Sequence, residues 1–205
     1  TDDMPALYPA QTELTAKDII ASAYAAAGGD VWTRPTSLSM DGYGVFYKDD
    51  KAVKHEHHRM WRVYDAGKTD AHAVDGKVRI ESIRDGKAVI DLSFDGTSTY
   101  TPAGKQPPSA ADAQWSNSFG FGVIRHALDD GYSVSRLPDD LLDGKSAYLV
   151  KITDPAGGET HFAIRQSDYA VVKVGFQTPR GWHERKYSNF YQNADDGSPE
   201  SAWVQ

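Results

Sequence analysis

Asp-Gly pairs divide this sequence into short segments, and no other feature constrains the fold more. The aspartates of these pairs stand at positions 41, 75, 85, 95, 130, 143 and 196. An Asp-Gly pair between two alternating runs favours a tight β-hairpin, because type I′ turns need two residues that tolerate a positive φ. The pairs therefore predict a chain made mainly of antiparallel strands.

The segments between the pairs alternate apolar and polar side chains with the period of a β-strand. Ile90, Leu92 and Phe94 share one face of their segment, and Tyr148 and Val150 share one face of theirs. One apolar and one polar face per strand indicate an antiparallel sheet with one side buried, and a sheet of this size curls around an interior. We expect strands at residues 37–47, 53–64, 77–84, 87–94, 97–101, 132–137, 146–153, 159–165, 170–177 and 182–191.

One amphipathic helix is expected near the N-terminus, at residues 16–27. Thr15 and Asp18 have the spacing of a capping box, which satisfies backbone N–H groups at a helix start. Apolar residues then recur at helical spacing, and Gly28-Gly29 supplies a C-cap.

A second helical stretch is expected at residues 111–128, where Trp115, Phe119 and Ile124 could face one way. Gly120 and Gly122 weaken this helix. They indicate either a kinked, mobile cover or a plain helix that packs on the sheet.

Composition excludes several functions. The chain carries a formal net charge of -7 without a basic run, which excludes a nucleic-acid interface. It has no Cys, so disulfides and thiolate metal sites are excluded. No apolar run approaches the roughly 18 residues of a transmembrane helix. The sequence starts at Thr1 instead of Met, so we expect that a signal peptide has been removed from an exported protein.

His55 and His57 are the candidate metal ligands or acid–base groups. In a regular strand they point to the same face, about 7 Å apart, and could share a metal with a third ligand from elsewhere. The alternative is a polar strand face near an edge of the sheet. The segment is not an HExxH motif, and the sequence has neither a nucleophile elbow nor a phosphate loop, so we expect no cofactor.

Aromatic and apolar side chains on the predicted strands and the second helix indicate a ligand pocket with a few polar handles, or else an ordinary filled core. Trp61 is expected on the same strand face as His55 and His57. The candidate lining residues are Met40, Phe46, Trp61, Ile90, Leu92, Phe94, Trp115, Phe119 and Phe121.

Several stretches resemble lipoprotein carriers of the LolA/LolB type. The N-terminal part of the resemblance is Ala25-Ala26-Ala27-Gly28-Gly29, then Trp32, then Leu38-Ser39-Met40-Asp41-Gly42. The later part comprises residues 142–148, 154–158, 162–165, 171–174 and 187–190. The order of elements is similar over residues 15–191, and the His-rich strand departs from the carriers.

This resemblance implies a mainly β (α+β) fold, namely a half-open antiparallel β-barrel with an N-terminal helix and a helical cover. We expect a single domain over residues 1–205, with 1–14 as a loose lead-in and 192–205 as a truncated or flexible tail. The implied function is a periplasmic carrier for a lipid or a lipoprotein acyl chain. The alternatives are an enzyme that uses His55 and His57 in the same cavity, and an envelope-assembly partner with a filled barrel.

Overall fold

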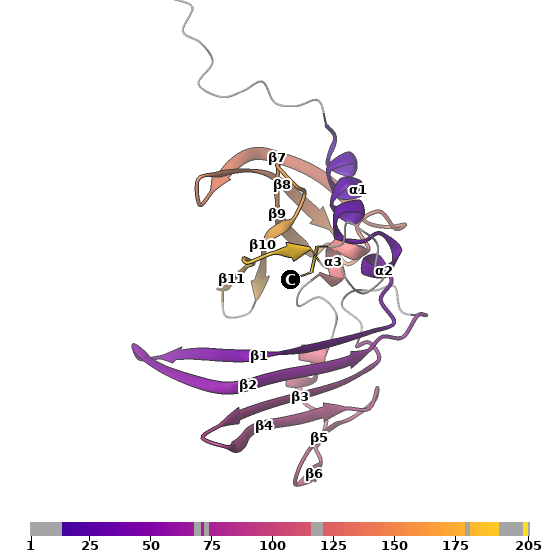
Figure 1. The fold of residues 1–205 in the computed structure, drawn as a ribbon. Coiled ribbons are helices and arrows are strands. Elements are labelled where there is room, and N and C mark those ends of the chain that lie inside the picture. Colours follow the sequence, from indigo (N-terminus) through magenta and orange to yellow (C-terminus); the bar gives the residue numbers. More distant parts are fainter. Residues whose placement is uncertain are drawn as a thin grey trace, which may run out of the picture. The chain divides into compact units, whose positions relative to one another are not determined.

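Two antiparallel sheets account for most of the structure, a computed structural model shown in Figure 1. The structure describes residues 14–67, 71, 74–115, 121–178, 181–192 and 203–204. Cα packing divides the chain into two compact units. We name residues 34–122 the meander unit, and residues 1–33 with 123–205 the helix–sheet unit. The expected lead-in up to residue 13 and most of the expected tail lie outside the described residues.

The meander unit is one curved sheet whose strands pair in chain order, β1 to β6 (Figure 1). Its strands are β1 (Ser37–Lys48), β2 (Lys51–Val63), β3 (Lys77–Arg84), β4 (Lys87–Phe94), β5 (Thr99–Thr101) and β6 (Gly104–Lys105). A short 3-10 helix, Ala110–Trp115, follows the last strand. β1 and β6 are the edges of this sheet.

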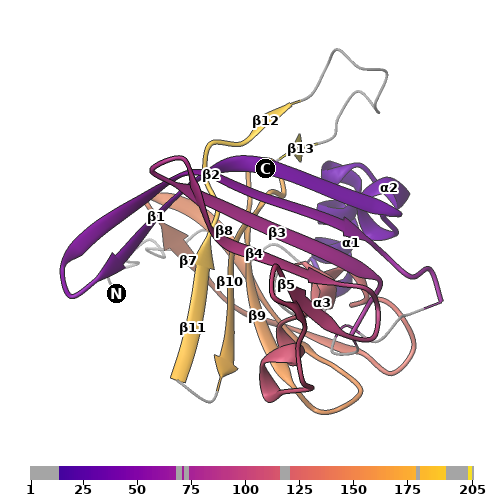
Figure 2. The same ribbon diagram turned by 90° about the horizontal axis from the view of Figure 1, so that it is seen from below.

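The helix–sheet unit holds a five-stranded sheet in the order β11-β10-β9-β8-β7, of which β11, β10 and β9 are seen side by side in Figure 2. The strands are β7 (Ser133–Leu142), β8 (Lys145–Thr153), β9 (Glu159–Arg165), β10 (Val171–Thr178) and β11 (Gly181–Lys186). The helices are α1 (Ala16–Ala27), α2 (Asp30–Thr33) and α3 (Gly122–Arg125), whose first residue still belongs to the meander unit. β12 (Tyr191–Gln192) and β13 (Trp203–Val204) form a separate two-stranded pair.

Local signals determine α1. The Thr15 hydroxyl accepts a hydrogen bond from the Asp18 backbone N–H, and the Asp18 carboxylate accepts one from the Thr15 N–H at 2.9 Å. Gly28 ends the helix in the left-handed region with φ 113°, which a residue without Cβ adopts at little cost. The predicted helix at residues 16–27 is confirmed.

The core of the helix–sheet unit lies on one face of the five-stranded sheet. Val150, Phe162 and Val174 pair across β8, β9 and β10, and all three are buried. On the same face, Arg136 donates a hydrogen bond from Nη1 to the backbone carbonyl of Leu14, 2.9 Å away, just before α1. The buried helix residues of this unit are Ala16, Ile19, Ile20, Ala23, Val123 and Ile124.

The mainly β prediction is confirmed, and each of the ten predicted strands overlaps an observed strand. The prediction of one continuous helix at residues 111–128 is wrong. The structure has the 3-10 helix up to Trp115 and then α3 from Gly122, while residues 116–120 lie outside the described residues. Neither main sheet closes on itself within the described chain. No described helix is both long and apolar enough to cross a membrane.

Candidate ligand-binding face

The six-stranded sheet presents one apolar face, and strand register determines which residues form it. Residues that pair directly across antiparallel strands project to the same side. Met40, Met60, Ile80 and Leu92 are paired in succession from β1 to β4. The next row in the same register consists of Leu38, Arg62, Val78 and Phe94. Phe46 and Ile90 lie on this face as well, through their pairing with Val53 and Ser82. We call this side the apolar face.

The 3-10 helix covers one end of the apolar face. The Trp115 ring stacks on Phe94 with centroids 5.8 Å apart and an interplanar angle of 18°. Its Nε1 donates a hydrogen bond to the Thr99 hydroxyl at 2.8 Å, and the Arg62 guanidinium donates to the Trp115 backbone carbonyl. Val78, Phe94 and Trp115 are buried together as a small core. This end of the face is therefore filled by the protein itself.

The other end of the apolar face is open. Met40 is 46% exposed and Phe46 is 43% exposed, although both side chains project to the same side as the buried core residues. Met60, Ile80, Ile90 and Leu92 are half-buried beside them. Met60 and Ile80 were not among the predicted lining residues, and the signal that could have found them is their register with Met40 and Leu92.

A β-bulge in β2 overturns the predicted arrangement of the histidines. Gly42 pairs with His58 and Gly44 pairs with His55, so Glu56 and His57 stand opposite the single residue Tyr43. The extra residue places His55 and His58 together on the apolar face. The prediction that His55 and His57 share a face is wrong.

The histidines on the two sides of β2 thus have different surroundings. Phe46 has its ring centroid 4.4 Å from that of His55 and 6.0 Å from that of His58. His58 Nδ1 lies 2.6 Å from the hydroxyl of buried Ser82. His57 Nδ1 instead lies 3.4 Å from the Arg59 guanidinium and 4.0 Å from the Asp41 carboxylate, on the opposite side of the sheet.

Gly44 makes room for the Phe46 ring. A Cβ on Gly44 would lie 2.6 Å from a ring carbon of Phe46, well inside van der Waals contact. The ring therefore covers the backbone at Gly44 and packs on His55. His55 is buried, and within the described residues its Nδ1 has no hydrogen-bond partner. The result is a small polar group beneath an exposed aromatic ring on an otherwise apolar surface.

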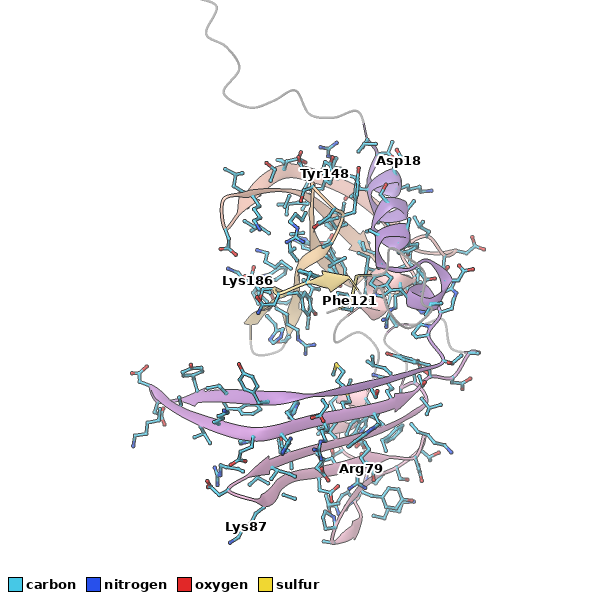
Figure 3. All side chains as sticks on the ribbon, viewed as in Figure 1. Asp18, Arg79, Lys87, Phe121, Tyr148 and Lys186 are labelled. Atoms are coloured by element: carbon cyan, nitrogen blue, oxygen red, sulfur yellow. The ribbon has the colours of Figure 1, made fainter. Side chains whose placement is uncertain are left out.

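The opposite face of the same sheet is charged. Asp41, Arg59, Glu81 and Asp91 pair in one row across four strands. Arg59 lies 3.3 Å from Asp41 and 3.4 Å from Glu81, while Arg79 (Figure 3) lies 3.1 Å from Asp91. Such a row of charged side chains joined by ion pairs is typical of a solvated sheet face.

Trp61 belongs to this charged face, because it pairs with Ser39 and Arg79. Two opposite faces of one sheet cannot line one pocket, so the prediction that Trp61 shares a lining with Met40 and Phe46 is wrong. Phe121 is half-buried just before α3 (Figure 3), and Phe119 lies outside the described residues.

A metal centre at the histidines has no geometric support. His55 and His57 project to opposite sides of β2, so they cannot chelate one ion. Among the described residues, no three His, Asp or Glu side chains are grouped closely enough to hold a metal ion. What the site offers is an apolar surface with the imidazoles of His55 and His58 at one edge.

Comparison with known proteins identifies the fold. Neither protein-family models nor curated protein sequences match this chain. A solved domain from Vibrio parahaemolyticus, provisionally assigned as an outer membrane lipoprotein-sorting protein, matches with a TM-score of 0.51 at 14% identity. The match covers 91% of this chain and 80% of that one. The chain has the fold of this lipoprotein-sorting domain.

Two further solved structures match with lower TM-scores. A LolA superfamily protein from Nitrosomonas europaea has a TM-score of 0.48 at 14% identity and covers 91% of this chain and 83% of its own. A DUF1329 family protein from Desulfovibrio piger has a TM-score of 0.46 at 13% identity and covers 92% and 82%. The resemblance to lipoprotein carriers that the sequence indicated is confirmed at the level of the fold.

Proposed function

We propose that this LolA-like chain binds and carries an apolar ligand, a lipid or the acyl chain of a lipoprotein, in the bacterial periplasm. The observation that carries the proposal is the open end of the apolar face. There Met40 and Phe46 are exposed on the same side of the sheet that Trp115 covers at the other end. The half-open barrel, its helical cover and a single domain over residues 1–205 are parts of this proposal. Calorimetric unfolding in two separate transitions would contradict the single domain.

The energetics suit a ligand that binds reversibly. Burial of apolar surface contributes roughly 25 cal/mol per Å², so covering about 200 Å² contributes about 5 kcal/mol. Each methylene of an acyl chain that leaves water adds about 0.8 kcal/mol, while association itself opposes binding by several kcal/mol. A chain of ordinary length therefore reaches useful affinity without any ion pair, and the half-buried His58 can contact its polar end.

The test compares two substitutions on the same strand. Met40→Glu places a carboxylate on the apolar face, and the control Val45→Glu places one on the charged face. Met40 is 46% exposed and Val45 is 40% exposed, so neither substitution should disturb folding strongly. The probes are cis-parinaric acid, whose fluorescence rises in apolar surroundings, and a palmitoylated peptide that competes with it.

We expect Met40→Glu to weaken binding of cis-parinaric acid at least about tenfold, while Val45→Glu leaves it unchanged. Competition by the palmitoylated peptide but not by its unacylated form would support a lipoprotein ligand. Equal binding by both variants would refute the assignment to this face. Failure of the wild-type protein to bind either probe would refute the carrier proposal.

A further inference from the structure

A groove in the helix–sheet unit shares no lining residue with the apolar face and has a different character. Its volume is about 760 Å³, within the range of small-molecule sites. Four segments surround it: the β7–β8 hairpin, the loop that joins β9 to β10, the start of β10, and the chain that leaves β11. Lys186 marks the end of β11 in Figure 3. The groove lies wholly within residues 142–190.

The groove is basic, although the whole chain has a formal net charge of -7. Four cationic side chains line it, against two carboxylates. The cations are Lys145, Arg165, Lys173 and Lys186, and the carboxylates are Asp143 and Asp168.

The cations differ in how they are compensated. Arg165 binds Asp168 through Nε at 2.8 Å, and Lys173 lies 3.1 Å from Glu184. Lys145 and Lys186 make no ion pair with any described residue. Their ammonium groups act on carboxylates only at longer range, Lys145 on Asp168 and Lys186 on Glu184.

The environment of Asp168 favours the charged carboxylate form of its side chain. Burial alone would raise its pKa, but the hydrogen bonds from Arg165 and the Ala170 N–H, with the charges of Arg165 and Lys145, keep the pKa below its usual value. The carboxylate is therefore held mainly by Arg165, and Lys145 adds to the positive charge around it.

Hydrogen-bond donors and apolar walls complete the groove. The hydroxyls of Ser146, Ser167 and Ser188 line it, and none of them makes a side-chain hydrogen bond to another described residue. One wall is the Phe190 ring, which packs under the Arg165 guanidinium at 5.1 Å. Leu142 and Val172 add further apolar surface. Lysines with several hydroxyl donors match a tetrahedral oxyanion, and the apolar walls fit an attached organic group.

We propose that this groove binds the phosphate of a phosphate ester, with Lys145 and Lys186 as its counter-charges and the organic part against Phe190. The same chemistry occurs in a glycerophospholipid headgroup and in a soluble phosphate ester. The proposal does not depend on the apolar face, so either site can fail without the other.

The experiment titrates ¹⁵N-labelled full-length protein with two probes and follows amide chemical shifts. The probes are glycerol 3-phosphate and dihexanoyl phosphatidylglycerol below its micellar concentration. We expect saturable shifts confined to residues 142–147, 165–168, 172–173 and 186–190, and we expect added salt to weaken the binding. Equal affinity for both probes would show that a soluble phosphate ester is enough to occupy the groove. Tighter binding of the lipid would show that the groove prefers a phospholipid headgroup. No saturable shift with either probe, or shifts centred elsewhere, would overturn the proposal.

Charge reversal tests the two lysines. Lys145→Glu with Lys186→Glu should weaken binding roughly tenfold or more, since both counter-charges become repulsive. The matched control reverses Lys77 and Lys87, two exposed lysines of the meander unit, and changes net charge equally. Equal weakening by both double variants would show a general charge effect and overturn the site. Neutral Lys145→Gln and Lys186→Gln variants repeat the test if the reversed pair folds poorly by circular dichroism.

Discussion

Replacing Trp115 should test how the sheet of the meander unit is closed at one end. The side chain is 1% exposed, stacks on Phe94 and donates a hydrogen bond to Thr99. Removal of a buried tryptophan typically costs about 3–5 kcal/mol, because the apolar contacts are lost and a cavity remains. We expect Trp115→Ala to lower the free energy of unfolding by that amount.

Two further variants separate the contributions. Trp115→Phe keeps an aromatic ring on Phe94 and loses the hydrogen bond. The Thr99 hydroxyl still donates to Asp112 at 2.6 Å, so the loss should be about 1–2 kcal/mol. Trp61→Ala removes an equally large side chain from the charged face, where it is 41% exposed, and should cost about 1 kcal/mol or less.

The measurement is urea unfolding followed by far-ultraviolet circular dichroism, because tryptophan fluorescence would change with the substitutions themselves. Hydrogen exchange of peptides from β3 and β4 adds a local readout, and Trp115→Ala should speed exchange there. The reasoning is refuted if Trp115→Ala destabilises no more than Trp61→Ala, since the 3-10 helix would then contribute nothing to the sheet.

Two other predictions concern single positions. Gly44→Ala should displace the Phe46 ring and lower the free energy of unfolding in urea by about 1 kcal/mol. Gly42→Ala should be neutral, because no atom lies within 4 Å of the new Cβ. Equal effects of the two substitutions would contradict the close approach of the Phe46 ring to Gly44. The Thr15 hydroxyl and backbone N–H lower the pKa of Asp18 below 3.8. The contribution of Asp18 to the free energy of unfolding is therefore fully present above pH 3.8 and is lost as the pH falls through the pKa of the folded state. The stability difference between wild type and Asp18→Asn should therefore shrink on acidification, and a pH-independent difference would contradict the capping box.

The sequence predicted α1 and most strand positions because their signals are local. The capping residues Thr15 and Asp18 lie within three positions of each other, and Gly28 follows directly after the last helical residue. Hairpin turns are equally local: Asp85 and Asp143 adopt positive φ at the predicted Asp-Gly turns. Features set by neighbours in the chain can be derived from the chain alone.

The bulge in β2 could not be predicted by counting. A period of two assigns His55 and His57 to the same face, and one extra residue reverses that assignment for every residue on one side of the bulge. The broken helix at residues 111–128 has a similar cause. Trp115 is fixed by Thr99 and by the guanidinium of Arg62, and both partners are distant in sequence.

Exposure by itself does not distinguish the candidate ligand face. β1 exposes Tyr43, Val45 and Tyr47 beside the charged row as freely as it exposes Met40 and Phe46 on the other side, and scattered exposed apolar residues are ordinary in proteins. The distinction lies in what accompanies them. The charged face carries cross-strand ion pairs that water can solvate. The row through Met40 instead leads to Met60, Ile80 and Leu92, which pack against the buried core. Trp115 covers one end of the apolar face, and the other end is exposed. Only an apolar ligand would be stabilised by covering the exposed end, and we therefore place the ligand there.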